Sequence, residues 1–466
     1  MCFIVKFTQI FALYIKLVIY SLIKEATMLI EFSVGNFLSF KNVNTISLLS
    51  SNDSYLKEDN TFILKNGLRL LKCIGFYGAN ASGKSNILKA LAFFKNFIIN
   101  SSKESQANEE IDVVNFKLNS SSEQLPSFFE IIFFADDTIY RYGFEINRKK
   151  ILGEWLFARF LSGENRLPKE NKLFVRDNNI VIGKNFKEGK KLEDKTRNNS
   201  LFLSVVAQFN GEISKKIIKW FLQYNIIYGH SDFSGKTAEI LDNNKNTKQG
   251  DRLKELIKSA DLGIEDIVTT EFEENYEDFI KHFPLILEEK RFVIDKNKPI
   301  LGMEINTKHK KYDENNKLIG FETFDPEKEE SDGTKRFFSI GGPLIDTLDA
   351  GKILFIDEIE SSLHPILVQE IIKLFNSKVT NPKNAQLIFT THNTSFLNLK
   401  FLRRDQIFFT EKSDYGESKI YSLIEFKNIR KDNSIGKNYL FGKFGAVPYV
   451  KNLSKQFIGE NEQKLF

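Results

Sequence analysis

Apolar and polar positions follow two different periods along this chain, which predicts a mixed α/β protein. Apolar residues alternate with polar ones over residues 28–48, which predicts two strands. Residues 127–147 show the same alternation and predict a hairpin that turns at residues 135–137. Shorter strands are expected over residues 155–160 and 173–182. Together these segments predict an antiparallel β subdomain.

Three apolar runs lack this alternation, as strands do that are buried on both faces of a parallel sheet. These runs lie at residues 70–77, 352–358 and 385–392. Helical spacing of apolar residues marks three other stretches: the segment that begins at Ser85, with Ile87, Leu91, Phe94 and Ile98 on one stripe, and residues 200–228 and 251–262. Residues 231–250 are polar, and we expect them to form a mobile loop. Two short strands are expected near residues 291–294 and 301–307. The chain therefore alternates between sheet and helix, as α/β proteins do.

Composition and charge narrow the class of protein. The 466 residues are 42% hydrophobic and 27% charged, which is typical of a globular chain. The net charge of +5 is too weak to indicate nucleic acid by itself. With Cys2 and Cys73 as its two cysteines, the chain has no disulfide framework and no cysteine-based metal site, which fits a cytoplasmic protein.

Residues 1–27 are apolar but carry three lysines, so their uninterrupted apolar stretches are too short to span a bilayer. The segment has no small-residue cleavage site, so we do not expect it to be a signal peptide. One interpretation of these residues is a helix that lies at a membrane interface. The preferred interpretation is that translation starts at Met28 and that the preceding residues come from a start site assigned too far upstream. We therefore expect no stable membrane partner.

Residues 78–85 fit the phosphate-binding pattern G-x-x-x-x-G-K-[ST] between an expected strand and an expected helix. Backbone N–H groups of such a loop converge on phosphate oxygens, so side chains at Gly78 and Gly83 would obstruct it. Lys84 brings a positive charge to the β- and γ-phosphates, and Ser85 offers a hydroxyl to Mg²⁺. The order of strand, loop and helix argues against a chance glycine-rich turn. The residues expected to hold the nucleotide are Gly78, Ala79, Asn80, Ala81, Ser82, Gly83, Lys84, Ser85 and Asn86.

A nucleotide site also needs an acidic residue at the end of a neighbouring strand to hold Mg²⁺, and Asp357 fits that role. Glu358 follows at once, and a carboxylate beside the γ-phosphate can orient or deprotonate the attacking water. His392 ends the next apolar run, which favours a sensor of the γ-phosphate. The alternatives are a solvated strand end for the two acids and a structural histidine for His392. His230, His282 and His309 lack the spacing of metal ligands, so we expect them to be surface or structural residues.

The spacing of these motifs distinguishes between classes of P-loop protein. More than half of the chain separates Lys84 from Asp357, whereas the two strands lie much closer together in compact P-loop domains. A long insertion there is typical of ABC-type heads, which also carry a signature loop and helix before the Asp-Glu strand. Ser331 and Gly333 can present a hydroxyl and backbone N–H groups to a phosphate. An ordinary helix N-cap is the alternative for Ser331.

Several motifs together resemble one family. GANASGKSN, SDGTKRFF, ILFIDEIESSLHP and LIFTTHN resemble the motifs of the AbiL-type (RloA-like) abortive-infection ATPases, which are related to the ATP-binding heads of SMC, RecF and OLD proteins. MLIEFSVGNFLSFKN, LFLSVVAQFN, FLRRDQIFF and GKNYLFGKFGAVPYV look like that family too, so the resemblance covers about residues 28–450. It implies an ABC-type P-loop ATPase head with an antiparallel β subdomain and a helical insertion. The signature departs from the usual ABC sequence because it lacks the second glycine.

The resemblance also implies a role for each motif, with ATP and Mg²⁺ as cofactors. The residues it assigns are Lys84 and Ser85 for phosphate and Mg²⁺, Asp357 for the metal, Glu358 and His392 for catalysis, Ser331 and Gly333 for the signature loop, and residues 360–364 for the dimer-facing D-loop.

The function implied by the resemblance is ATP hydrolysis at a head-to-head homodimer, coupled to sensing in antiphage defence. A DNA or phage-derived trigger and a separate effector protein encoded nearby are the partners we expect. A RecF-like DNA-repair ATPase that binds DNA directly is the main alternative. A transporter ATPase subunit and a nucleotide-binding scaffold with negligible turnover are the others, and the pair of Asp357 and Glu358 argues against the scaffold.

The motifs divide the chain into four expected segments. These are an N-terminal extension at 1–27, an ATPase lobe with the P-loop and β subdomain at 28–199, a helical insertion at 200–290, and a second ATPase lobe with the signature, the acidic pair and His392 at 291–466. The residues after His392 are too few for another domain of about 100–150 residues. We therefore expect the effector to be a separate protein.

Overall fold

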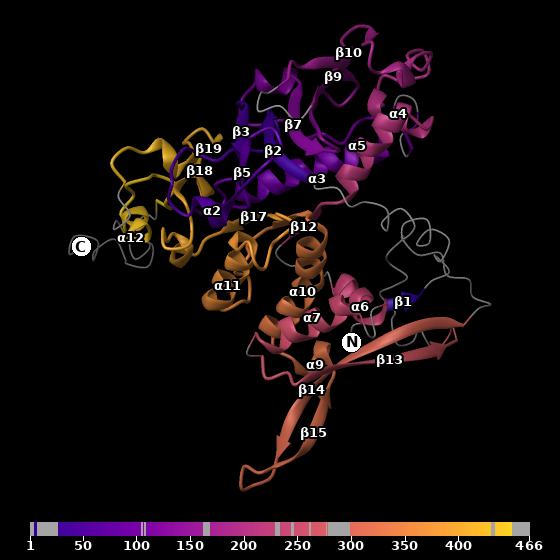
Figure 1. Cartoon of the computed structure of the whole chain (residues 1–466). Helices are drawn as coiled ribbons and strands as arrows, with labels where there is room; N and C mark the ends of the chain where they lie inside the picture. The colour runs from indigo at the N-terminus through magenta and orange to yellow at the C-terminus, as the bar shows by residue number, and fades with distance from the viewer. Residues whose placement is uncertain are drawn as a thin grey trace, which may run out of the picture. The chain divides into compact units, whose positions relative to one another are not determined.

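The computed structural model describes residues 4–6, 27–103, 106, 109–161, 168–228, 234–243, 247–260, 262–275, 277, 299–429 and 434–449 (Figure 1). The chain forms two compact units, each assembled from segments that lie far apart in the sequence. Unit 1 consists of Met1–Leu29, Phe133–Ile139 and Lys219–Ile388, and unit 2 consists of Ile30–Ile132, Tyr140–Ile218 and Phe389–Phe466. The four segments expected from the sequence remain a prediction.

A seven-stranded sheet with the order β11-β10-β9-β8-β7-β2-β3 confirms the predicted β subdomain. Its strands are β2 (Met28–Gly35), β3 (Asn44–Ser47), β7 (Ser127–Ala135), β8 (Thr138–Ile146), β9 (Ile151–Phe160), β10 (Asn171–Arg176) and β11 (Ile180–Ile182). The pairs β2–β3, β9–β10 and β10–β11 are antiparallel. The β7–β8 hairpin turns at Asp136 and Asp137, whose φ angles of 49° and 55° suit a tight two-residue turn.

The single strand predicted over residues 173–182 is wrong, because β10 and β11 form a hairpin there. Asp177 and Asn179 interrupt the apolar run, and the Asp177 N–H donates to the Asn179 carbonyl at 3.1 Å. Polar residues of this kind favour turns, since they tolerate the backbone angles that a turn needs.

Helix α3 (Lys84–Asn100) packs an aromatic cluster in unit 2. The four predicted stripe residues, Ile87, Leu91, Phe94 and Ile98, are all buried. The Phe94 ring stacks on Phe144 at a centroid distance of 5.0 Å. Aromatic pairs of this geometry contribute about 0.5–1.5 kcal/mol beyond the area they bury. The helix that follows the glycine-rich loop is therefore firmly anchored in its unit.

Strand β6 (Cys73–Tyr77) leads into that loop and pairs in parallel with β18 (Ile407–Lys412), which pairs antiparallel with β19 (Ser418–Ser422). The predicted strand at residues 70–77 is two strands. Leu70 and Leu71 belong to β5 (Arg69–Leu71), which pairs with β4 (Thr61–Ile63), and the Lys72 N–H between them donates to Asn60. Helix α2 (Lys57–Asn60) precedes β4.

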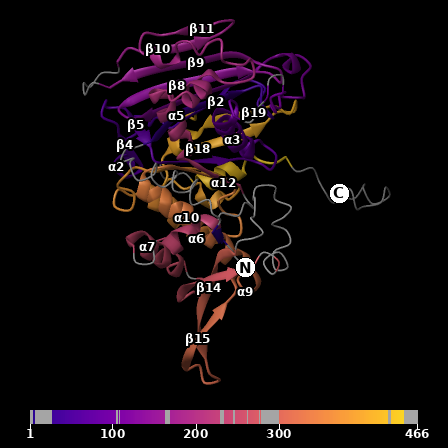
Figure 2. The same cartoon turned by 90° about the vertical axis from the view of Figure 1, so that its right-hand side faces the viewer.

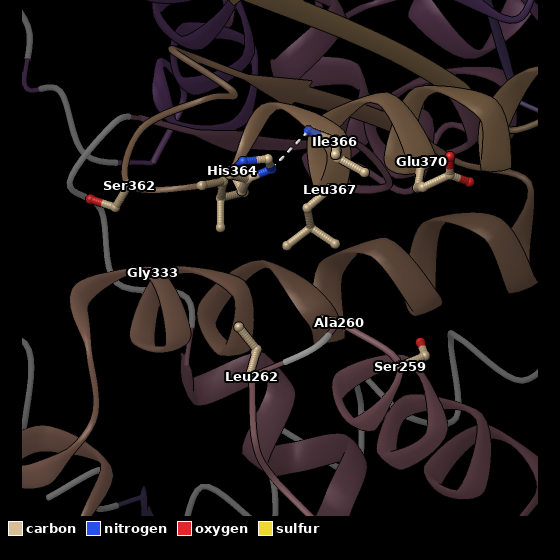
Figure 3. Close-up of a pocket in the computed structure, with 10 residues that line it drawn as sticks. Ser259, Ala260, Leu262, Gly333, Ser362, His364, Ile366, Leu367 and Glu370 are labelled. Carbon is tan, nitrogen blue, oxygen red and sulfur yellow. Dashed lines mark hydrogen bonds between the residues drawn. The ribbon is translucent and has the colours of Figure 1, made fainter.

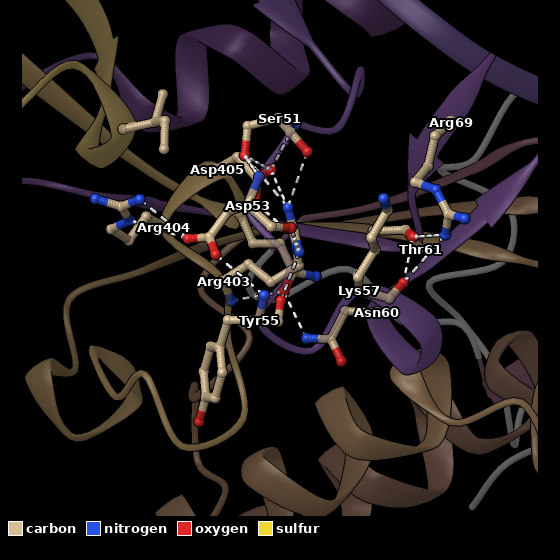
Figure 4. Close-up of polar contacts among 12 residues, drawn as sticks. Ser51, Asp53, Tyr55, Lys57, Asn60, Thr61, Arg69, Arg403, Arg404 and Asp405 are labelled. Atoms are coloured by element: carbon tan, nitrogen blue, oxygen red, sulfur yellow. Dashed lines mark hydrogen bonds and ion pairs between the residues drawn. The ribbon is translucent and has the colours of Figure 1, made fainter. Parts of the chain in front are cut away.

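Arg403 holds the segment before α2 in place (Figure 4). Its guanidinium is 1% exposed and donates to both carboxylate oxygens of Asp405, at 2.9 and 2.7 Å. It also donates to the carbonyls of Asp53 and Tyr55, at 2.8 and 2.5 Å. Asp405 accepts two further bonds from Ser51. Every nitrogen of this buried arginine is thereby paired, as buried charge requires.

In unit 1, β12 (Asn225–Ile227) pairs in parallel with β16 (Ile353–Ile356), and β17 (Gln386–Thr391) is next in the strand order. The expectation of continuous helix over residues 200–228 is therefore partly wrong. Helices α4 (Phe202–Gln208) and α5 (Glu212–Leu222) form there, but β12 follows them. Pairing with β16 decides the conformation of a short apolar run that fits either element.

Helices α6 (Ser234–Asn243) and α7 (Lys248–Lys258) pack on α10 (Asp332–Ala350) in the same unit. They correct the mobile loop expected over residues 231–250. Thr237 inserts into α10, because its hydroxyl donates to the Phe338 carbonyl at 2.6 Å and accepts from the Gly342 N–H at 2.9 Å. A Cβ on Gly342 would meet the Thr237 backbone at 2.5 Å. The Gly-Gly-Pro sequence inside α10 is therefore the site of a helix–helix contact.

A second sheet in unit 1 contains β13 (Asp266–Glu274), β14 (Ile300–Tyr312) and β15 (Leu318–Phe324) as an antiparallel ribbon (Figures 1 and 2). Strand β1 (Ile4–Lys6) pairs with β14. A strand predicted near residues 291–294 lies outside the described residues. Three short helices complete the description, at α9 (Pro326–Glu329), α11 (Pro365–Asn376) and α12 (Ile435–Leu440). Among the described residues, no helix is long and apolar enough to cross a membrane.

Candidate functional site

The glycine-rich loop lies in unit 2, between the buried strand β6 and helix α3, as the sequence predicts. A Cβ on Gly78 would lie 2.3 Å from the Thr410 carbonyl oxygen. Gly83 has a φ of 111°, and a Cβ there would lie 2.3 Å from the Ser418 hydroxyl. Both positions therefore require glycine, because any other side chain would collide with neighbouring groups. The loop forms a cradle that side chains would fill.

Lys84 is the first residue of α3, and its side chain folds back across the loop. The ammonium Nζ donates to the carbonyls of Gly78 and Ala79, both at 2.9 Å. It also lies 3.3 Å from Nδ1 of His392, which directly follows β17. Lys84 is only 4% exposed. Two residues more than 300 positions apart in sequence thus meet in the same cradle, as their motifs predict.

The other predicted loop residues differ in exposure. Asn80 and Ala81 are exposed, Ala79 and Ser85 are half-buried, and Ser82 is buried. The hydroxyl of Ser82 has no hydrogen-bond partner among the described residues, which leaves a buried donor at the loop. Ala81 has a φ of 61°, a conformation that a non-glycine residue holds only where the surroundings impose it. These features fit a loop shaped to receive the oxygens of a phosphate.

Three residues that the sequence analysis missed hold the loop in shape. The Ser418 hydroxyl donates to the Ser82 carbonyl at 2.6 Å and forms a hydrogen bond with the Ser39 hydroxyl at 2.8 Å. Asn86 Nδ2 donates to that same Ser39 hydroxyl at 2.8 Å. The Ala79 N–H donates to the Ala446 carbonyl at 2.8 Å. Asn86 thus supports the loop from the side, and only a three-dimensional arrangement brings the other three residues to it.

The acidic pair lies in unit 1, directly after β16. Asp357 is 7% exposed, and its N–H donates to the Ile227 carbonyl at 2.8 Å, which continues the pairing of β12 with β16. Glu358 has a φ of 47°, in the left-handed region. Non-glycine residues in that region cost of order 1–3 kcal/mol and cluster at functional sites. The end of the strand thereby turns sharply at Glu358.

Two further side chains share the surroundings of the acidic pair. Burial and the charge of Asp357 raise the pKa of the Tyr228 hydroxyl to about 12, so it stays protonated as a donor. Burial lowers the pKa of Arg336, and the charges of Asp357 and Glu358 oppose that effect. Neither residue was predicted. Tyr228 follows a strand that the sequence analysis took for helix, and Arg336 stands in an otherwise apolar helix.

The predicted signature residues begin α10. The Ser331 hydroxyl accepts from the Thr334 N–H at 3.1 Å, so Ser331 is the N-cap that was the alternative interpretation. A Cβ on Gly333 would lie 2.8 Å from the Ser362 carbonyl. Ser362 has a φ of 58°. The start of α10 and the predicted D-loop therefore touch, and glycine is what permits this approach.

Figure 3 shows a pocket of about 560 Å³ at this contact. It is bordered by the end of α7, the D-loop and the first turn of α11, with Gly333, Ser362 and His364 at one side. His364 and Ser362 are exposed, and His364 Nδ1 accepts from the Ile366 N–H at 3.3 Å as the cap of α11. The predicted signature and D-loop thus form one exposed surface of unit 1.

The predicted site residues therefore gather in two groups. Unit 2 brings together the phosphate loop and His392, and unit 1 brings together Asp357 and Glu358 near Arg336, with the signature loop against residues 360–364. His230 and His282 lie outside the described residues. His309 stacks on Phe324 and bonds Glu330 in the β14–β15 ribbon, which confirms a structural interpretation.

Comparison with known proteins identifies the family. Residues 73–398, well over half of the chain, match the family model described as "AAA domain, putative AbiEii toxin, Type IV TA system". No curated protein matches the chain. The family match runs from the strand before the phosphate loop past His392, and so includes every predicted site residue.

Solved structures resemble the chain only distantly. An SMC head bound to the C-winged helix domain of ScpA is 14% identical with a TM-score of 0.37, covering 84% of this chain and 97% of that one. The SMC head domain from Thermotoga maritima is 12% identical with a TM-score of 0.37, covering 84% and 98%. The protein cbiO1 from Clostridium perfringens, part of an ABC transporter complex, is 12% identical with a TM-score of 0.27, covering 79% and 87%. The assignment rests on the family model, and the chain belongs to this AAA-domain family and is an ATPase.

Proposed function

We propose that this chain hydrolyses ATP with Mg²⁺ between two copies of itself, as the sensor or regulator of an antiphage system with a separate effector. The observation that carries the proposal is the glycine cradle, with Lys84 held across it and His392 at 3.3 Å. Its exposed and half-buried N–H groups suit phosphate oxygens, and its lysine suits the β- and γ-phosphates.

The loop residues bind by exchanging partners. Lys84 Nζ now donates to two loop carbonyls, which are weaker acceptors than a phosphate oxygen. A bound triphosphate takes over these bonds while the lysine moves little. The buried Ser82 hydroxyl gains an acceptor, and Ser85 at the start of α3 offers its oxygen to Mg²⁺.

Asp357 and Glu358 have the two remaining roles in this proposal, which are metal binding and acceptance of a proton. Mg²⁺ neutralises charge that builds up on the phosphates, and Asp357 is the carboxylate of unit 1 that would hold it. Glu358, at the turn directly after the strand, accepts the proton of the attacking water in this proposal. Burial and the charge of Asp357 hold the pKa of Tyr228 at about 12, so its hydroxyl stays protonated at this end of the site.

Exposed residues at the signature loop and the D-loop of unit 1 support the proposed dimer. Ser331 and Asp332 at the start of α10 are exposed, as are Ser362 and His364. An exposed helix N-terminus can meet a phosphate held by another copy, which is the role that the signature resemblance implies. The family name, which refers to toxin–antitoxin systems, supports a partner protein that carries out the defence.

A phage challenge tests the defence role. We expect the chain alone to give no protection, and co-expression with the product of a neighbouring gene to protect the host. The Lys84→Ala variant in that pair should abolish protection without lowering the amount of either protein. Full protection by this chain in a host that lacks the neighbour would contradict a separate effector, and protection by the Lys84→Ala pair would contradict ATP control.

Direct DNA binding is the second candidate, because unit 2 exposes several basic residues near its end. Lys419, Lys427, Lys437 and Lys443 are all exposed. Arg430, Lys431, Lys451 and Lys455 lie outside the described residues. Cations of this kind contact phosphate backbones and give an affinity that falls steeply with salt. A strong, salt-sensitive DNA affinity of the purified chain would favour a RecF-like role over an effector partner.

A further inference from the structure

Arg336 is a buried arginine with two guanidinium nitrogens that have no hydrogen-bond partner among the described residues. It stands in the second turn of α10, five positions after the N-cap Ser331, and is 8% exposed. Within the part of the chain that the structure describes, its Nε and Nη2 have no hydrogen-bond partner. Buried donors are nearly always paired, and an unpaired buried charge is costly. An arrangement of this kind needs a reason.

Arg403 is a buried arginine with a structural role, and its hydrogen bonds provide a comparison for Arg336. Its guanidinium is buried too, and it donates to both oxygens of Asp405 and to the carbonyls of Asp53 and Tyr55 (Figure 4). Among the described residues, Arg336 Nε and Nη2 have no such acceptors. Helix α10 contacts β16, the strand that leads directly into the acidic pair, and the charges of Asp357 and Glu358 favour the charged form of Arg336 against the effect of burial. The unpaired donors therefore lie on the helix that packs against the strand of the acidic pair.

Helix α10 connects this arginine to the signature loop. Gly333 packs within van der Waals distance of the Ser362 carbonyl, so the start of α10 and the D-loop move together. A helix transmits displacement rigidly over one or two turns, so a shift at Ser331 also shifts Arg336. Glu358 lies at the turn that directly follows β16, with a φ of 47°, and it is half-buried.

We propose that Arg336 is a positioning residue that bonds the Glu358 carboxylate when the nucleotide site closes, and so couples the signature loop to hydrolysis. This inference rests on the proposed ATPase function. In the open state the arginine is held unpaired, at a cost to stability. In the closed state its free N–H groups pair with Glu358 and aim that carboxylate at the attacking water. Closure around ATP thereby relieves the cost and completes the site.

The test compares Arg336→Met with wild type and with Arg252→Met. Arg252 lies on α7 and pairs with Asp349 at the far end of α10. Its substitution by methionine therefore removes the same charge at a place away from the acidic pair. We expect Arg336→Met to melt at the same or a higher temperature than wild type without nucleotide, and to gain a smaller shift from Mg²⁺ with a non-hydrolysable ATP analogue. Its kcat should fall about 10- to 100-fold with KM changed less than about threefold, the scale of a misplaced catalytic group.

Arg336→Lys supplies the conservative variant. It keeps the charge but not the planar fork, so it should recover part of kcat. Arg252→Met should match wild type in kcat and in the shift with the analogue. Arg336→Met that hydrolyses ATP and gains the full shift would overturn this inference alone. A lower melting temperature without nucleotide, with kcat per folded molecule unchanged, would show a structural arginine instead. Wild type without ATPase activity or nucleotide shift would overturn the proposed function itself.

Discussion

The Lys84 ammonium lies 3.3 Å from Nδ1 of His392, and this contact defines the state of the histidine. An ammonium group can only donate, so Nδ1 is the acceptor and a neutral His392 carries its proton on Nε2. The other ring nitrogen, Nε2, is then an N–H donor. A donor at this position suits a γ-phosphate oxygen, and it supports the proposed sensor role better than a base role.

The first prediction concerns this donor. His392→Ala should lower kcat about 10²-fold or more, the usual effect of removing one donor that stabilises a transition state, while ATP affinity changes little because Lys84 remains. Single-turnover phosphate release and fluorescent ATP binding measure the two effects separately. His309→Asn is the control, since His309 lies in the β14–β15 ribbon against Phe324. Equal turnover of His392→Ala and wild type would leave His392 a structural residue.

The second prediction concerns the source of the signature loop. A mixture of Lys84→Ala and Gly333→Asp proteins should regain ATPase activity although each alone is inactive, because one composite site of the mixed dimer has both parts intact. Gly333→Asp breaks its own loop by steric conflict with the Ser362 carbonyl at 2.8 Å. Activity measured over a series of mixing ratios should peak near equal amounts. A mixture that stays inactive at every ratio argues for a site made within one chain.

The third prediction concerns the stability of unit 2. Arg403→Ala should lower the free energy of unfolding by about 3–5 kcal/mol, because it leaves the buried Asp405 carboxylate without its partner. The neighbouring Arg404 pairs with Asp53 at 3.0 Å on a partly exposed surface, so Arg404→Ala should cost about 1 kcal/mol or less. Denaturant unfolding measures both variants. If both substitutions lowered the free energy of unfolding by similar amounts, burial would not determine how much each ion pair contributes to stability.

Much of the site was predictable from sequence because local geometry dictates it. Gly78 and Gly83 stand where no side chain fits, and Lys84 must begin the helix that follows them. Asp357 and His392 come directly after short buried strands, which apolar runs reveal. These features depend on neighbours in sequence. The same holds for the β7–β8 hairpin, whose turn residues mark it.

What the sequence could not reveal depends on distant partners. Residues 225–227 are as apolar as a helix turn, and only β16 makes them a strand. Ala446 reaches the phosphate loop through a backbone carbonyl, which no residue type signals. The sequence shows Arg336 as a charged residue in an otherwise apolar expected helix. Its proposed role could be recognised only once the structure placed it within the electrostatic influence of Asp357 and Glu358. Segment 231–250 was polar because its helices bury only one face.

The central claim is that Lys84 binds the nucleotide and Glu358 hydrolyses it. The most direct test measures ATP binding and phosphate release for Lys84→Ala and Glu358→Gln in parallel, with Mg²⁺ present. We predict that Lys84→Ala loses measurable binding, whereas Glu358→Gln binds ATP as wild type does, turns over at least about 100-fold more slowly and accumulates as a dimer on sizing with ATP. Unchanged ATP affinity of Lys84→Ala, or wild-type turnover of Glu358→Gln, would contradict the account.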